Sequence, residues 1–206
     1  MKKHRQLLAL LICLVMSVSL LTGYFETKAA TEEPAQSGEQ DATQETAETR
    51  EITDMAGRKV TVPAAENIES VFSAGPVAAI FLYMVAPDKL LGWNYELNDV
   101  EKSIILEKYQ DLPNFGMGDA VNYEAVIAAN PTIAINSGKI NDAMVSDCDA
   151  LSESLGIPVV AVDNELNNSA EAFRFMGELL GVEDHAEELA QYAEQVFTDI
   201  NALSDI

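Results

Sequence analysis

The sequence predicts an α/β fold, a Rossmann-like parallel sheet with flanking helices. Short β-branched and apolar runs, the kind that a parallel sheet buries on both faces, recur between residues 68 and 162. Helix-forming segments separate these runs, and the connections are short and contain Gly, Pro or Asn. Strand and helix alternate repeatedly, which is typical of a doubly wound sheet. In such a sheet, ligand-binding loops lie at the carboxyl ends of the strands.

Residues 122–138 show this pattern most clearly. Asn122 is a suitable N-cap for a helix that runs through the apolar residues 125–129. Asn130 and Pro131 end this helix, because proline disfavours the α conformation in the residue before it. The β-branched run 132–135 then predicts a buried strand, and small polar residues follow at its exit.

The remaining elements follow from similar signals of capping, turns and periodicity. They are a hairpin over residues 52–63, a strand over 68–72, a helix over 77–85 that Pro76 opens, a strand over 90–93, helices over 101–109 and 142–155, a strand over 159–162, a helix over 169–180 and a long helix from Glu183 onward.

The N-terminal residues 1–29 predict an export signal. Basic residues at positions 2, 3 and 5 precede an apolar stretch, 7–21, that is short for a membrane span. Residues 20–23 resemble the start of a lipoprotein cleavage box, but Tyr24 stands where the lipidated cysteine belongs. We therefore expect an exported protein without a lipid anchor, at the cell surface, outside the cell or in the periplasm. Cleavage after Ala29 and retention of the signal as a tether both stay open.

The chain divides into four predicted segments. Residues 30–50 are rich in Glu, Gln, Thr and Ala, so they bury too little apolar surface to fold and predict a disordered acidic linker. Residues 51–182 form the predicted α/β ligand-binding lobe. Residues 183–206 predict one helix without a breaker, longer than the helices before it.

The charge of the mature chain excludes two classes of partner. Without residues 1–29 the basic count falls from 12 to 8 and the acidic count from 34 to 33, so the formal net charge is −25. Such a surface repels nucleic acid and anionic lipid. Cys148 is then the single cysteine, and its helical context predicts a small packed residue.

Several catalytic and cofactor motifs are missing from the sequence. It contains no GxxxxGK[ST] loop and no GxSxG elbow, and Gly116-Met117-Gly118 lacks the third glycine of a dinucleotide fingerprint. The single mature histidine, His185, begins the last helix among glutamates and is expected on the helix surface. We therefore expect no enzymatic activity, no covalently bound cofactor and no bare metal site.

The predicted strand exits offer neutral polar groups and aromatic rings. These groups suit a bulky organic ligand. Trp93 is equally consistent with a core aromatic at a strand end. The candidate ligand-binding residues are Ser73, Gly75, Trp93, Asn94, Tyr95, Asn136, Ser137 and Lys139.

A series of segments, in order along the chain, resembles a known family. The resemblance is to bacterial ABC-transporter substrate-binding proteins that carry iron-siderophore, haem or cobalamin complexes, the helical-backbone metal receptors. The segments are ITDMAGRKVTVP at 52–63, the strand at 68–73, APDKLLGWN at 86–94, LPNFG at 112–116, YEAVIAANPTIAI at 123–135, LGIPVVAVD at 155–163 and FMGELLGVEDHAEELAQY at 175–192.

This resemblance implies a fold and a function. Members have two α/β lobes joined by one long helix, so the chain would be the N-terminal lobe with the start of the inter-lobe helix, and the second lobe would be absent. The implied function is capture of a metal chelate, a ferric siderophore ahead of haem or a corrinoid, and its delivery to an ABC permease. Glu124 matches the first-lobe acidic residue that docks onto permease arginines. The alternatives are a non-transporting lobe that serves as a protein-interaction or sensor module and, less favoured, a Rossmann-like enzyme.

Overall fold

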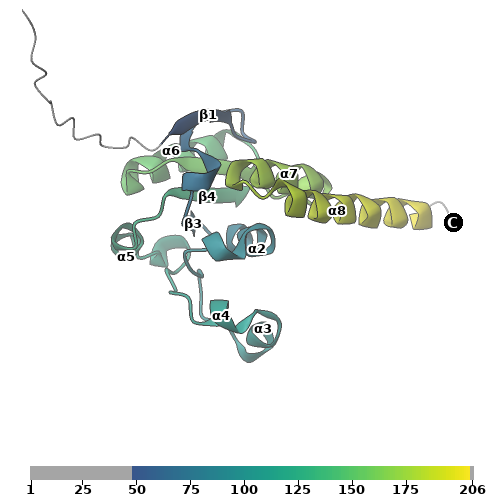
Figure 1. The fold of residues 1–206 in the computed structure, drawn as a ribbon, viewed down its shortest axis with the longest axis horizontal. Coiled ribbons are helices and arrows are strands. Elements are labelled where there is room, and N and C mark those ends of the chain that lie inside the picture. Colours follow the sequence, from purple (N-terminus) through teal and green to yellow (C-terminus); the bar gives the residue numbers. More distant parts are fainter. Residues whose placement is uncertain (1–47, 205–206) are drawn as a thin grey trace, which may run out of the picture. The chain divides into compact units, whose positions relative to one another are not determined.

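A three-stranded parallel sheet forms the centre of the lobe (Figure 1). The computed structural model describes residues 48–204, so the predicted signal and most of the predicted linker lie outside the described residues. The strands are β3 (Val71–Ser73), β4 (Ile133–Gly138) and β5 (Val159–Asp163), in the order β3-β4-β5. In this register Val71 is opposite Ile133, and Ala134 is opposite Val159. The predicted α/β class is confirmed.

The strand predicted over residues 90–93 is only a pair of isolated bridges, so the expectation of a fourth full strand is wrong. Leu90 bridges Val71 in parallel, and because β4 already pairs with Val71, this stretch lies on the other edge of β3. Its pairing then changes partner: the N–H of Trp93 donates to the carbonyl of Pro113 at 2.8 Å, and the N–H of Phe115 donates to that of Trp93 at 2.9 Å.

One face of the sheet carries the larger apolar cluster. Val71, Ile135 and Val160 point to this face, and helices cover them. The covering helices are α2 (Pro76–Val85), α7 (Ser169–Leu180) and α8 (Glu183–Ser204). Pro76 occupies the first turn of α2, as predicted, where its missing N–H costs no hydrogen bond.

The opposite face of the sheet carries a second apolar cluster. Phe72, Ala134 and Ala161 point to this face. It is covered by α5 (Tyr123–Ala128) and α6 (Asp142–Leu155). Successive side chains of each strand point to opposite faces of the sheet. Each strand therefore contributes to both apolar clusters, as expected of a parallel sheet that is buried on both faces.

The helix predicted over residues 101–109 is split in two. α3 (Asp99–Ile104) begins with a capping box in which the Asn98 and Glu101 side chains bond each other's backbone N–H. The chain then leaves the helical conformation, and the N–H of Leu106 donates to the hydroxyl of Tyr83 at 3.0 Å. α4 (Glu107–Gln110) follows. A bond to a distant tyrosine therefore replaces the bond that would have continued the helix.

An aromatic cluster attaches the α3–α4 segment to the lobe. The rings of Trp93 and Tyr109 each lie within 5.6 Å of the Tyr83 ring, centroid to centroid. The indole N–H of Trp93 donates to the Tyr109 carbonyl at 2.8 Å, and the Tyr109 hydroxyl donates to Asp88 at 2.7 Å. In Figure 1, α3 and α4 lie beyond α2, away from the sheet.

The predicted hairpin consists of β1 (Thr49–Thr53) and β2 (Lys59–Pro63), paired antiparallel. β1 begins at Thr49, so regular structure starts within the segment that the sequence predicted as a disordered linker to residue 50. The folded lobe therefore begins slightly earlier than predicted. Thr49 and Arg50 pair with residues of β2, and the composition of the segment around residue 50 does not reveal this pairing.

A buried carboxylate joins this hairpin to the sheet. Asp54 is 3% exposed, and its carboxylate accepts hydrogen bonds from the backbone N–H groups of Ala56, Arg58 and Ala161. It also forms an ion pair with the Arg58 guanidinium at 3.1 Å. Arg58 in turn contacts Asp149 at 3.1 Å. Because Ala161 lies in β5, one side chain connects the hairpin turn with the sheet.

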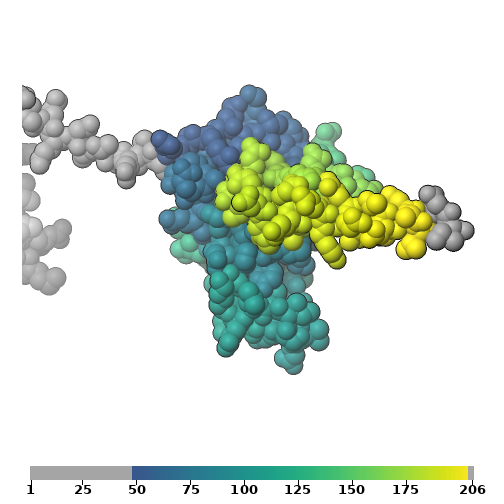
Figure 2. All heavy atoms as spheres, turned by 45° about the vertical axis from the view of Figure 1, so that its right-hand side comes forward, coloured from purple at the N-terminus to yellow at the C-terminus, as the bar shows by residue number. Residues whose placement is uncertain are grey.

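Helices α7 and α8 form the outer layer of the lobe. Both α6 and α7 end where predicted, at Gly156 and Gly181, which adopt left-handed φ values of 69° and 72°. The N-cap of α7 is Asn168, one residue before the predicted Ser169. The end of α8 projects clear of the lobe (Figure 2), and none of the helices within residues 48–204 is long and apolar enough to cross a membrane.

An exposed charge cluster connects α7 with α8. The Arg174 guanidinium contacts Glu187 at 2.7 Å and Glu194 at 2.6 Å. The hydrogen bond from Arg174, followed by one from Gln191, lowers the pKa of Glu187 to about 2.

We expect Asp54→Asn to lower the free energy of unfolding by about 2–4 kcal/mol. The amide cannot replace a carboxylate that accepts from three backbone N–H groups and one guanidinium in a buried site. Urea denaturation measures the change. The matched control is Glu51→Gln, which removes an exposed pair with Lys59 and should cost less than about 1 kcal/mol. Equal losses in both variants would contradict a central role for Asp54.

We expect the stabilising effect of Arg174 to disappear in acid. The folded-state pKa of Glu187, about 2, lies below its ordinary value of 4.5, so this pair contributes stability above pH 4.5 and loses it as the pH falls toward 2. Arg174→Gln should therefore lower the melting temperature at pH 6 and change it much less at pH 2.5. If Arg174→Gln lowered the melting temperature equally at both pH values, the stabilising ion pair between Arg174 and Glu187 would be refuted.

Candidate ligand-binding site

The candidate site lies where the carboxyl ends of β3 and β4 meet. After β3 the chain crosses to Leu90 on one edge of that strand, whereas β4 pairs with the other edge. Adjacent parallel strands whose connections run in opposite directions leave a crevice outside their carboxyl ends, and ligands bind there in α/β sheets. Ser73 ends β3, and residues 136–138 end β4.

A buried asparagine holds three loops together at this edge. Asn94 is 2% exposed, and its side-chain amide donates to the carbonyl of Ser73 at 2.9 Å and to that of Gly116 at 3.3 Å. Gly116 has a φ of 80°, and a Cβ there would overlap the Ala120 carbonyl, so this loop requires glycine. The loop that begins α2 is thereby fixed to the loop that leads to α5.

Three polar oxygens at this edge are buried without a hydrogen-bond partner among the described residues. They are Ser73 Oγ, Asn94 Oδ1 and Ser137 Oγ. Buried polar atoms in folded proteins nearly always have a partner, so each of these atoms requires an explanation. Their grouping at the carboxyl edge of β3 and β4 indicates unused hydrogen-bonding capacity at the place where a doubly wound sheet binds ligand.

The N-terminus of α2 opens onto the same edge. Gly75 is its N-cap and offers no side-chain hydrogen bond, and an added Cβ at Gly75 would meet no atom within 4 Å. The uncapped backbone N–H groups carry the positive end of the helix dipole. They add hydrogen-bond donors to the site.

The exits of β4 and β5 are tied to each other. Lys139 forms an ion pair with Glu165 at 3.3 Å, and the N–H of Asn164 donates to the carbonyl of Gly138 at 3.3 Å. The carboxylate of Asp163, 8% exposed, accepts from the N–H of Glu165 at 2.9 Å. This corner of the site is therefore preformed, and its lysine is already paired.

Two of the predicted ligand residues lie elsewhere. Trp93 is 3% exposed and belongs to the aromatic cluster under α3 and α4, so the structure favours the core role that the sequence left open. The Tyr95 hydroxyl donates to Glu101 at 3.0 Å, and burial, followed by this bond, raises the pKa of Tyr95. Both residues line a separate cavity of about 440 Å³, and Lys102 is also part of its lining. The other predicted residues, Ser73, Gly75, Asn94, Asn136, Ser137 and Lys139, gather at the carboxyl edge of the sheet.

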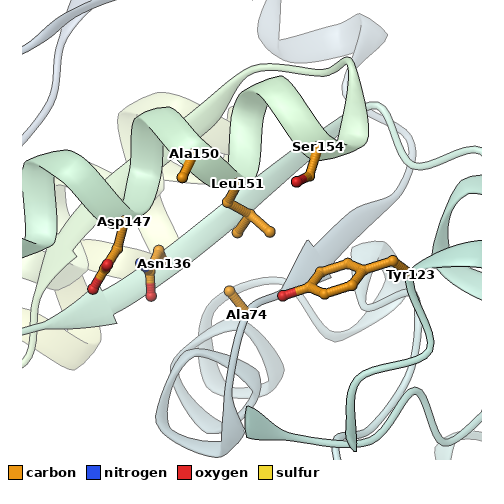
Figure 3. A pocket seen from close by; sticks show the side chains of 7 residues that line it. All are labelled: Ala74, Tyr123, Asn136, Asp147, Ala150, Leu151 and Ser154. Atoms are coloured by element: carbon orange, nitrogen blue, oxygen red, sulfur yellow. The ribbon is translucent and has the colours of Figure 1, made fainter. Parts of the chain in front are cut away.

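A groove beside this edge was not predicted from the sequence. It has a volume of about 380 Å³ and lies between α5 and α6 (Figure 3). Its lining includes Tyr123 and Asp147, which we did not single out as site residues. One signal was present: Asp147, Ala150, Leu151 and Ser154 share one face of α6 at helical spacing. Within residues 48–204 no group of three or more His, Cys, Asp or Glu side chains is placed to hold a metal ion.

Comparison with known proteins assigns the chain to a family. The model of the periplasmic binding protein family matches residues 77–204. No curated protein matches the chain.

Several solved structures share the fold. They include an ABC transporter solute binding protein from Sulfurospirillum deleyianum, 23% identical with a TM-score of 0.58, covering 69% of this chain and 45% of that one. The TroA-like periplasmic binding protein FepB from Veillonella parvula is 26% identical with a TM-score of 0.55, and the match covers 76% of this chain and 50% of FepB. The siderophore-binding protein FeuA from Bacillus subtilis, in complex with ferri-bacillibactin, is 16% identical with a TM-score of 0.54. The match covers 73% of this chain and 50% of FeuA.

The match extends over most of the described lobe. The chain spans about half the length of the solved structures that it matches. The family model covers more than half of the chain, from α2 to the end of α8. The chain therefore belongs to the periplasmic binding protein family.

Proposed function

We propose that this chain is the substrate-binding component of an ABC importer and that it captures its cargo at the carboxyl edge of β3 and β4. The observation that carries the proposal is the group of three buried oxygens, Ser73 Oγ, Asn94 Oδ1 and Ser137 Oγ, that lack partners among the described residues. A ligand with hydrogen-bonding groups supplies those partners when local side-chain rotation exposes the oxygens. The proposal involves no catalytic step, and release to the permease follows capture.

The proposed cargo is a metal chelate, with a ferric siderophore as the first candidate. Family membership and the fold shared with a ferri-bacillibactin complex support this class. Other proteins of this fold bind haem or molybdate, so cargo varies among them. Haem and corrinoids are the next candidates. The neutral hydroxyl and amide groups at the edge suit the polar periphery of a chelate and leave its metal to the chelator.

The proposed site of contact with the permease includes Glu124. This residue lies in the first turn of α5 and is exposed. A carboxylate at the start of a helix is available to arginines of a partner, and such charge-assisted pairs are stronger than neutral hydrogen bonds. We propose that Glu124 pairs with permease arginines during docking.

Titration of the full chain tests the proposed function. Isothermal titration calorimetry with ferri-bacillibactin, haem, cyanocobalamin and molybdate should give saturable binding of the ferric siderophore. Ser73→Ala should weaken this binding about 3- to 10-fold, as expected for one lost hydrogen bond, and leave the unfolding free energy unchanged, because the hydroxyl has no partner in the described lobe.

Ser152→Ala is the matched control. Its hydroxyl donates to the Ile157 carbonyl at 2.7 Å, just before the amino end of β5 and so opposite the carboxyl edge, and this variant should lose stability and keep its affinity. Absence of binding to all four compounds would refute the proposed function. Unchanged affinity in Ser73→Ala would refute the proposed place of binding.

A further inference from the structure

The outer side of β1 carries backbone groups that point away from the hairpin. At the two ends of the hairpin, the carbonyl of Glu48 accepts from the N–H of Ala64 at 2.8 Å, and the N–H of Asp54 donates to the carbonyl of Arg58 at 2.9 Å. Hydrogen-bonded pairs alternate along an antiparallel ladder, so the even-numbered residues of β1 bond with β2. The odd-numbered residues turn their N–H and C=O groups to the other side. These residues are Thr49, Glu51 and Thr53.

The other outer strands of the described lobe have closed edges. β2 carries Lys59 and Pro63 at positions whose backbone points away from β1, and both residue types hinder pairing with a further strand. The hairpin turn covers β5, where the N–H of Ala161 donates to Asp54. Residues 90–91 cover β3. Among the strands within residues 48–204, β1 alone therefore presents an open edge.

A cavity of about 240 Å³ lies between β1 and α7. Four successive residues of β1, 50–53, belong to its lining. Successive side chains of a strand point to opposite faces, so a cavity lined by all four residues reaches around the edge of the strand. α7 contributes Phe175, Glu178 and Leu179. The open edge of β1 thus has a partly apolar floor beside it.

Arg50 holds the wall of this cavity in place. Its guanidinium donates to the carbonyls of Glu178 and Leu179, both at 2.8 Å, in the last turn of α7. The Nε of Arg50 is buried and has no hydrogen-bond partner within residues 48–204. Buried donors in folded proteins nearly always have a partner, so this nitrogen is a second, independent sign of unused hydrogen-bonding capacity here.

An extended polypeptide is the ligand that satisfies alternating N–H and C=O groups along a strand edge. A helix bonds its own backbone groups and would leave those of β1 unpaired. A second copy of β1, paired antiparallel about its central residue, would place Glu51 opposite Glu51, and like charges directly opposite each other are destabilising. Residues 30–47 of this chain are acidic and contain no large apolar side chain for the floor of the cavity. The remaining occupant is a segment of another protein.

We propose that the open edge of β1 binds an extended segment of a partner protein, which pairs antiparallel with β1 and adds a third strand to the hairpin. One face of this segment places aliphatic side chains over Phe175 and Leu179. The other face places a basic side chain beside Glu51, whose ion pair with Lys59 is exposed to solvent. The proposal does not depend on cargo capture, because the cavity shares no residue with the three buried oxygens at the sheet edge.

Nuclear magnetic resonance of the isotope-labelled full chain tests the proposal with the peptide acetyl-Thr-Val-Lys-Val-Thr-amide. Its central lysine is designed to lie opposite Glu51. Saturable shifts are expected for the amide signals of Thr49, Glu51 and Thr53. A methyl group on the backbone nitrogen of the lysine removes an N–H that faces β1 and should weaken binding about 10-fold or more. The same methyl group on the preceding valine points away from β1 and should change binding by less than about threefold.

Two variants of the protein make the same comparison from the other side. Glu51→Pro removes an N–H that points away from β2, a position where an edge strand tolerates proline, and should weaken peptide binding about 10-fold or more. Glu51→Gln keeps this N–H and loses only the charge, so it should weaken binding by no more than about threefold. Unchanged amide signals of β3, β4 and β5 show that each variant is folded.

Three results would overturn the proposal. The first is the absence of shifts at the odd-numbered residues of β1 up to millimolar peptide. The second is equal binding of the two methylated peptides, or the reverse order, since antiparallel pairing with β1 requires the lysine N–H. The third is equal binding to folded Glu51→Pro and Glu51→Gln. If Glu51→Pro does not fold, the methylated peptides decide with the unmodified chain. Because the probes contain no cargo, failure here is distinguishable from failure of siderophore binding.

Discussion

Helices cover both faces of the parallel sheet, and this constraint sets where each polar side chain at its carboxyl edge points. Ser73 and Ser137 continue the face of Val71 and Ile135, which packs under α2 and α7, so their hydroxyls are buried and find no partner within residues 48–204. Asn136 continues the opposite face and reaches the groove beside α6. The alternation of side chains along β4 therefore separates the polar groups at this edge into two sets, the buried hydroxyls on one face and the groove that Asn136 lines on the other.

Local signals predicted most of the fold. The ranges of α6 and α7 agree with prediction because glycine in the left-handed conformation ends each helix, and such a stop depends on a single residue. The errors occur where a residue far away in the sequence determines the backbone conformation. Residues 90–93 leave β3 because Pro113 and Phe115 pair with Trp93, and the helix predicted over 101–109 breaks where Tyr83 binds the N–H of Leu106. Neither partner is visible in the local sequence.

The sequence also indicated part of the candidate site. Small polar residues after buried apolar runs identified Ser73 and Asn136, because strand polarity and connection order place such residues at one edge. Whether Trp93 faces ligand or core depends on Tyr83 and Tyr109, which come from separate segments and which only the packed structure brings together. The groove depends on the spacing of α5 and α6, and no sequence pattern gives the distance between two helices that lie on a sheet.

The edge and the groove are held at a fixed spacing by the backbone that they share. The N–H of Ala74 donates to the Ile135 carbonyl at 2.9 Å, so the residue after β3 remains part of the sheet. Ser73, immediately before it, belongs to the edge, and Ala74 itself lines the groove. Edge and groove are therefore lined by consecutive residues of one segment, and the hydrogen bond between Ala74 and Ile135 holds that segment against β4.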